Sequence, residues 1–120
     1  MNKVLIAIIK DKDKILLIKR ANEPFKNSWS FVSGKGAFEE TSNPKIAIKK
    51  EIKFDLKCEF FIETFKQFNS KTEEIYVFSG LIKGEPNINK EHILEYKWVD
   101  STEIKNINLA FEQNKIFKDF

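Results

Sequence analysis

Residues 29–57 join a short aromatic strand to a glycine-containing loop and then to a helix that carries acidic side chains. Gly34 and Gly36 lie in the loop, where glycine lets the backbone approach an anion or present a carbonyl to a metal ion. Few folds place a strand, a glycine-containing loop and an acidic helix in this order. The segment therefore predicts a loop that begins at the end of a strand and leads into an acidic helix.

The helix is predicted to begin at Pro44, with Ser42 or Asn43 as its N-cap, and to end at about Leu56. At about 100° per residue, apolar side chains share one face and lysines share another. The apolar face consists of Ile48, Ile52 and Leu56, and the basic face of Lys49, Lys50, Lys53 and Lys57.

Glu51 and Asp55 are four residues apart, so their carboxylates lie one above the other along the edge of the apolar face. Like charges at this spacing repel by about a few tenths of a kcal/mol in an isolated helix. Mg²⁺ between them would reverse that effect, because Mg²⁺ takes oxygen ligands and usually combines one or two carboxylates with substrate phosphates. A solvated pair of surface acids is the alternative interpretation.

Most of the remaining chain has the patterns of β-strands. Apolar and β-branched runs predict strands at 4–9, 15–19, 29–32, 58–68, 74–82 and 96–99. The first two are expected to form a hairpin, and Asp100 or Ser101 to open a C-terminal helix marked by Ile104, Ile107, Phe111 and Ile116. This mixed order predicts an α/β (α+β) fold, a sandwich around a mixed sheet, with residues 1–120 as a single domain.

Composition and charge narrow the classes of partner and compartment. The net charge is only +3 and the lysines are spread along the chain, which argues against a nucleic acid partner. Cys58 is the single cysteine, so no internal disulfide can form, as suits a reducing compartment. The apolar run Val4–Ile9 is far too short to span a bilayer. The sequence therefore predicts a cytoplasmic protein without a membrane partner.

The order and spacing of these residues resemble the Nudix hydrolase family over nearly the whole chain. Gly34 and Glu40 match the start of its box. After a two-residue insertion near 42–43, the helix positions that correspond to the box are Lys50, Glu51, Ile52, Phe54, Asp55, Lys57 and Cys58. Similar runs lie at 15–20, 27–31, 91–92 and 95–99, and residues 31–35 are similar to the dihydroneopterin triphosphate branch.

The chain also departs from the family pattern. Phe54 stands where the box has a carboxylate, and Asp55 is one methylene shorter than the usual glutamate. Lys50 offers a point charge where the family has the planar fork of arginine. Together these differences predict fewer bound metal ions, weaker metal binding or lost turnover.

The resemblance implies a divalent-metal-dependent hydrolase that cleaves a phosphoanhydride bond in a nucleoside diphosphate-linked molecule, with Mg²⁺ or Mn²⁺ as cofactor. It implies Gly34, Glu40, Glu51 and Asp55 as metal ligands, the first through its carbonyl. Lys50 is expected to pair with an acid, and Glu51 and Lys50 to take part in catalysis.

The general base and the substrate contacts are less closely specified by the sequence. Glu91 is the expected base, with Glu73, Glu74 and Glu95 as alternatives, and His92, the only histidine, is expected to be solvated. The expected substrate-binding residues are Arg20, Lys35, Trp29 and Phe31.

Other functions stay open at this point. A catalytically impaired Nudix-type module that binds or senses a nucleotide is the main alternative, and Phe54 motivates it. A domain that contacts protein or RNA through the lysine face of the helix ranks third. A homodimer is compatible with the sequence.

Overall fold

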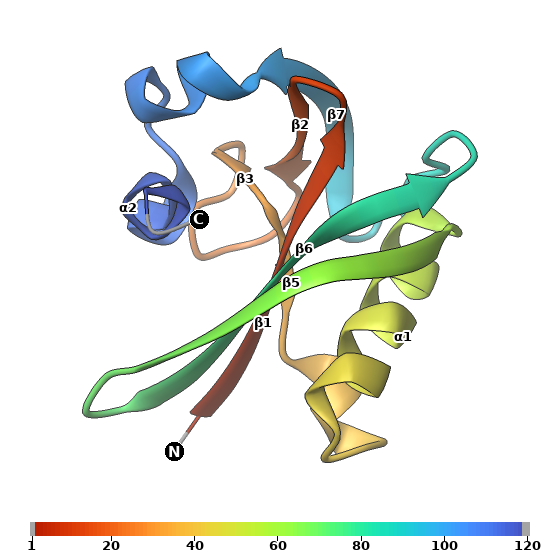
Figure 1. The fold of residues 1–120 in the computed structure, drawn as a ribbon, viewed down its shortest axis with the longest axis vertical. Helices are drawn as coiled ribbons and strands as arrows, with labels where there is room; N and C mark the ends of the chain where they lie inside the picture. The colour runs from red at the N-terminus through yellow and green to blue at the C-terminus, as the bar shows by residue number, and fades with distance from the viewer. Residues whose placement is uncertain (1, 119–120) are drawn as a thin grey trace.

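The computed structural model describes residues 2–118 and combines a mixed β-sheet with helices (Figure 1). The strands are β1 (Asn2–Asp11), β2 (Lys14–Arg20), β3 (Trp29–Ser30), β4 (Val32–Gly34), β5 (Glu59–Asn69), β6 (Glu73–Lys83) and β7 (Ile93–Asp100). The α-helices are α1 (Pro44–Leu56) and α2 (Gln113–Phe117), and the 3₁₀ helices are η1 (Gly36–Glu39), η2 (Ser101–Asn106) and η3 (Ala110–Glu112).

The sheet is built around β1, which pairs with strands from both halves of the chain. The strand order is β3-β2-β1-β6-β5, with β4 added on β1 and β7 added on β2. β1 runs parallel to β6 and antiparallel to β2 and β4. The fold is therefore the α+β arrangement with a mixed sheet that the sequence predicts.

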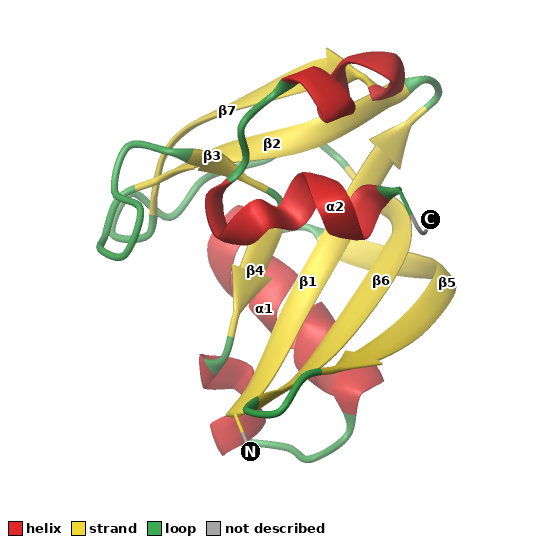
Figure 2. Cartoon of the chain, turned by 90° about the vertical axis from the view of Figure 1, so that its left-hand side faces the viewer, coloured by secondary structure: helices red, strands yellow, loops and turns green. Residues whose placement is uncertain are grey.

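Two layers of apolar side chains cover the two faces of the sheet. Alternate residues of β1 face opposite layers, because successive strand side chains point to opposite sides. Leu5, Ala7 and Ile9 pack with α1, whereas Ile6 and Ile8 pack with residues of the C-terminal segment. Figure 2 shows α2 on the near side of β1 and α1 on the far side, so the helices enclose the sheet.

The hairpin and the third predicted strand differ in detail from the sequence-based expectation. β1 and β2 pair only near the turn, where Lys10 faces Ile15, because β4 pairs with Leu5–Ala7 of β1 while β6 takes the opposite edge. The predicted strand at 29–32 is two short strands, since β3 pairs with β2 and β4 pairs with β1.

The prediction of one continuous C-terminal helix is wrong. After η2, Ile107 and Leu109 have extended backbone angles, with ψ of 132° and 147°. Phe111 and Glu112 then have φ angles of 57° and 55°, in the left-handed region. This irregular path brings both Ile104 and Leu109 into the apolar layer on the β1 face, and packing of that kind overrides weak helix propensity.

None of the helices formed by residues 2–118 combines the length and apolar character of a membrane span.

Candidate active site

The loop and the helix of the candidate site are joined by a specific N-cap. Asn43, the alternative to Ser42, caps α1, because its side-chain oxygen accepts hydrogen bonds from the backbone N–H groups of Lys45 (3.0 Å) and Ile46 (3.4 Å). Pro44 occupies the first helical position, where a missing N–H costs nothing. The cap fixes where the helix starts and hence which side chains face the sheet.

Glu51 and Asp55 are buried on the inner side of α1. Only 8% of Glu51 and 4% of Asp55 is exposed to solvent, and neighbouring Ile48 and Ile52 are fully buried. Asp55 Oδ1 has no hydrogen-bond partner, which makes it the single buried side-chain oxygen or nitrogen without one in residues 2–118. A buried polar atom left unpaired is unfavourable, so this oxygen is a candidate for a ligand contact.

Burial raises the pKa of both carboxyl groups. The pKa of Glu51 rises to about 7, first because of burial and then because the charge of Asp55 lies beside it, while the positive charge of His92 acts in the opposite direction. The pKa of Asp55 rises to about 6, again through burial. Two desolvated acids that hold protons this tightly would be relieved by a cation.

Gly34 lies directly against the Glu51 carboxylate. A Cβ atom at position 34 would be 1.8 Å from Glu51 Oε1, whereas a Cβ at Gly36 would meet no atom within 4 Å. The absence of a side chain at position 34 therefore creates the space that the Glu51 carboxylate occupies. The glycine at the end of β4 is a steric requirement of this site.

Glu40 forms an ion pair with a lysine of α1. Lys50 Nζ lies 3.0 Å from Glu40 Oε2, and both side chains are substantially exposed. Within residues 2–118, no group of three or more His, Cys, Asp or Glu side chains is arranged to hold a metal ion. Two carboxylates without a third still fit Mg²⁺, which commonly completes its octahedron with water and substrate phosphates.

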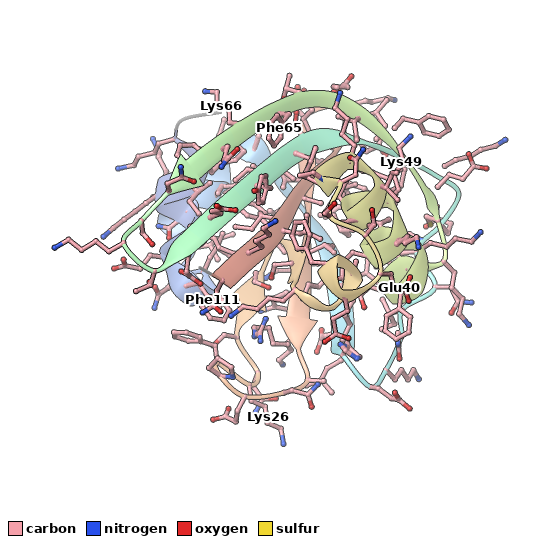
Figure 3. The ribbon with its side chains drawn as sticks, turned by 90° about the horizontal axis from the view of Figure 1, so that it is seen from below. Lys26, Glu40, Lys49, Phe65, Lys66 and Phe111 are labelled. Carbon is pink, nitrogen blue, oxygen red and sulfur yellow. The ribbon has the colours of Figure 1, made fainter. Side chains whose placement is uncertain are left out.

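The acids open onto a large cavity of about 1010 Å³. One wall comes from the loop and α1, and includes Gly34, Lys35, Glu40, Lys50, Glu51, Lys53, Phe54 and Asp55. The other walls come from distant parts of the chain, and include Ile6, Ile18, Arg20, Asn22, Glu73, His92, Phe111 and Gln113. Glu40 and Phe111, which both line the cavity, lie well apart in Figure 3.

The expected substrate-binding residues divide into two groups. Arg20 and Lys35 line the cavity. Phe31 does not, because it is fully buried beside Phe117, with ring centroids 6.0 Å apart. Trp29 is also outside the cavity lining; its ring lies 4.1 Å from the ammonium group of Lys97. The structure thus places Phe31 in the core and Trp29 under a lysine.

The expected general base, Glu91, does not line the cavity. Its backbone is fixed by Asn22, whose side chain donates to the Glu91 carbonyl at 2.7 Å. Of the three alternatives, Glu95 lies 3.4 Å from Lys19 and Glu74 accepts from Tyr76 at 2.7 Å, and only Glu73 lines the cavity.

Several cavity residues were not identified from the sequence. Gln113 is buried, and its side-chain oxygen accepts from the Phe31 backbone N–H at 2.8 Å. Phe111 lies over the guanidinium group of Arg20, 4.8 Å from ring centroid to Cζ. Both belong to the C-terminal segment that the sequence predicts as a regular helix. The Phe54 and His92 rings meet edge to face at the α1 wall.

Comparisons with known proteins agree with this architecture. The family model described as NUDIX domain matches residues 1–120. No curated protein sequence matches the chain significantly. Among solved structures, the MutT NUDIX hydrolase from Burkholderia pseudomallei has a TM-score of 0.75 at 17% identity, covering 98% of this chain and 95% of that one.

Two further structures show the same similarity. The solution structure of the E. coli ORF135 protein has a TM-score of 0.73 at 22% identity, covering 97% of this chain and 85% of that one. The NUDIX domain of Shewanella oneidensis NrtR, in a cocrystal with ADP ribose, has a TM-score of 0.74 at 16% identity, covering 97% and 83%. At these identities the likeness establishes a shared fold.

Proposed function

The chain belongs to the NUDIX domain family, and from that premise we propose that it is a divalent-metal-dependent hydrolase that cleaves a phosphoanhydride bond in a nucleoside diphosphate-linked molecule. The observation that carries this proposal is the buried pair Glu51 and Asp55, in which Glu51 packs against Gly34 and one Asp55 oxygen has no partner. The pair opens onto a cavity of about 1010 Å³, at the upper end of the usual range for ligand pockets.

Glu51, Asp55 and the carbonyl of Gly34 are the groups that would hold the cation. Their oxygen donors suit Mg²⁺ or Mn²⁺. Such a cation supplies neutralisation of the diphosphate charge and lowers the pKa of bound water. Glu40 stays a candidate ligand, although Lys50 holds it in the structure described here.

The remaining chemistry belongs to side chains on the cavity walls. Arg20 and Lys35 carry positive charge at the cavity surface, where they would bind and orient the phosphates. Glu73 supplies a carboxylate within the cavity as an acceptor for a proton from water, and it is a better first choice for mutation than Glu91.

Turnover is the direct test of the proposed function. Purified protein would be incubated with Mg²⁺ or Mn²⁺ and a panel that includes nucleoside triphosphates, ADP-ribose and a pterin triphosphate, and substrate and products would be separated and quantified by anion-exchange chromatography. Asp55→Asn should lower kcat/KM by about 100-fold or more, the size of losing one preorganised electrostatic group. Asp11→Asn, at the exposed end of β1, is the matched control. Absence of metal-dependent product from every substrate would refute the proposal.

A second function is favoured by one feature of the same wall. Phe54 is 56% exposed at the cavity, at the position where a carboxylate would add a metal ligand. A module that binds a nucleotide without hydrolysing it would be stabilised by RT ln(1 + [L]/Kd), about 2.7 kcal/mol at 100-fold Kd. Thermal stabilisation by a nucleotide with no product formed would select this function over the first.

A further inference from the structure

Phe54 and His92 form a contact at the α1 wall of the cavity. Their ring centroids are 5.4 Å apart and the ring planes meet at 89°, an edge-to-face arrangement. Both residues line the cavity, although they are far apart in sequence. Edge-to-face ring pairs are favourable beyond the area they bury, so the contact favours one placement of the imidazole.

The loop that carries His92 is fastened to the end of α1. The backbone N–H of Asn87 donates to the carbonyl of Leu56 at 2.8 Å, and that of Asn89 donates to the carbonyl of Asp55 at 2.9 Å. Carbonyls in the last turn of a helix have no partner within the helix, so these bonds satisfy groups that would otherwise need water. The loop is thereby tied to the same helix that carries the acids.

The His92 backbone is held on both sides as well. Its N–H donates to the Asn89 carbonyl at 3.0 Å, and its carbonyl accepts from the Ala21 N–H at 3.0 Å. The second bond links the loop to the end of β2, next to Arg20. The His92 side chain is exposed, as the sequence predicts, but its backbone is held in place and its ring contacts Phe54.

His92 interacts electrostatically with the Glu51 carboxylate. His92 acts electrostatically on Glu51 in the direction that favours the ionised carboxylate, so the imidazole lies within electrostatic range of the acid pair. Lys50, a lysine of the same wall, is already paired with Glu40. A carboxylate at position 54 would attract a cation, whereas an imidazole held beside a phenyl ring presents N–H donors to an anion.

We propose that Phe54 and His92 form an anion-binding unit, in which Phe54 positions the imidazole and His92 donates an N–H to a phosphate oxygen of the substrate. The inference rests on the proposed function in that the bound anion is the diphosphate of the substrate. It assigns to position 54 a role in binding phosphate in place of a role in binding metal. Arg20 and Lys35 would contact the same diphosphate from other walls.

The single histidine of the chain makes a direct test practicable. In protein without an affinity tag, the imidazole C–H resonances in an NMR spectrum come from His92 alone. Inorganic diphosphate would be titrated in the absence of metal and substrate, and its Kd measured by calorimetry. The variants are His92→Gln, Phe54→Leu and Phe54→Tyr, and Phe61→Leu, an exposed phenylalanine on β5 outside the cavity, is the matched control.

Diphosphate should shift the His92 resonances, and His92→Gln should weaken diphosphate binding about tenfold, as expected for a hydrogen bond to a charged group. Phe54→Leu should move the free His92 resonances through loss of the ring current and weaken binding several-fold. Phe54→Tyr, which keeps a ring, should leave the free His92 resonances and the diphosphate affinity close to those of wild type. Phe61→Leu should change neither. If substrate hydrolysis is found, His92→Gln should raise KM more than it lowers kcat.

Unchanged diphosphate affinity in His92→Gln, or His92 resonances that stay still while diphosphate binds, would overturn the inference. So would Phe54→Leu leaving the free His92 resonances in place. These outcomes differ from failure of the proposed function, which is absence of turnover, because diphosphate binding is measured without turnover. An active hydrolase with wild-type KM in His92→Gln would retain the function and reject the anion-binding unit.

Discussion

At the scale of single residues, the site depends on what is missing at position 34. The Cα of Gly34 leaves room for the Glu51 carboxylate, and no other residue type does so, because the first atom of any side chain would overlap Oε1. The carboxylate in turn lies beside Asp55, whose free oxygen faces no protein donor. The absence of a Cβ at position 34 thus allows the Glu51 carboxylate to lie where it does.

Gly34→Ala should displace the Glu51 carboxylate and lower metal affinity and kcat/KM by about 100-fold, since a shift near 1 Å in a catalytic group has effects of that size. The matched control is Gly36→Ala, where an added Cβ meets no atom within 4 Å. Calorimetric titration with Mn²⁺ and steady-state kinetics would measure both effects. Equal losses in the two variants would show that loop flexibility matters and the steric contact does not.

At the scale of elements, the acidic helix is defined by its two ends. Asn43 caps the N-terminus, and Lys57 ends the helix with φ 56° and ψ 38°, in the left-handed region. The family box has glycine at the position that Lys57 occupies, and the backbone angle explains why glycine suits it. A lysine at this position is costly, because its Cβ is crowded when the backbone is left-handed.

Lys57→Gly should stabilise the protein by about 1 kcal/mol, because an L-residue in the left-handed region costs roughly that amount. Lys57→Ala is the control, since it removes the same charge and stem but keeps a Cβ. Chemical denaturation would compare the free energies of unfolding of the three proteins. A gain in Lys57→Ala equal to that in Lys57→Gly would assign the effect to charge on the lysine face.

At the scale of the whole molecule, the cavity exists because the sheet brings separate parts of the chain together. α1 supplies the acids, the end of β2 supplies Arg20, and the loop before β7 supplies His92. The C-terminal segment adds Phe111 and Gln113. The burial that this assembly imposes on Glu51 and Asp55 also makes the stability of the metal-free protein depend on pH.

Folding raises the pKa of Asp55 from 3.8 to about 6 and that of Glu51 from 4.5 to about 7. The folded protein therefore binds protons more tightly than the unfolded chain. The stability that comes from this tighter binding is fully present below about pH 4 and is lost as the pH rises through 6 to 7. Glu51→Gln should be on the order of 2 kcal/mol more stable than wild type at about pH 8. The gain should vanish near pH 4 and shrink when Mg²⁺ is added.

Thermal unfolding of wild type and Glu51→Gln across this range, with and without Mg²⁺, would measure the difference. Glu59→Gln is the control, because Glu59 is exposed at the start of β5. A stability difference between wild type and Glu51→Gln that does not change with pH would contradict the burial argument.

Periodicity alone determined much of the architecture. Alternating and continuous apolar runs located the strands, and the spacing of Ile48, Ile52 and Leu56 placed Glu51 and Asp55 at the edge of the buried face of α1. These features are local, because they depend on strand and helix geometry within a few residues. The loop followed by an acidic helix was therefore predictable, and so was the family that it resembles.

Tertiary structure decided which side chains of each element reach the site. Phe31 enters the core, Glu40 pairs with Lys50, and His92 meets Phe54, although nothing in the local sequence distinguishes them from their neighbours. The C-terminal segment breaks where helix propensity predicts continuity, because packing on the sheet outweighs a weak local preference. Contacts between residues far apart in sequence set burial, charge and cavity shape, so only the folded chain shows how the acids come to be desolvated beside a positioned histidine.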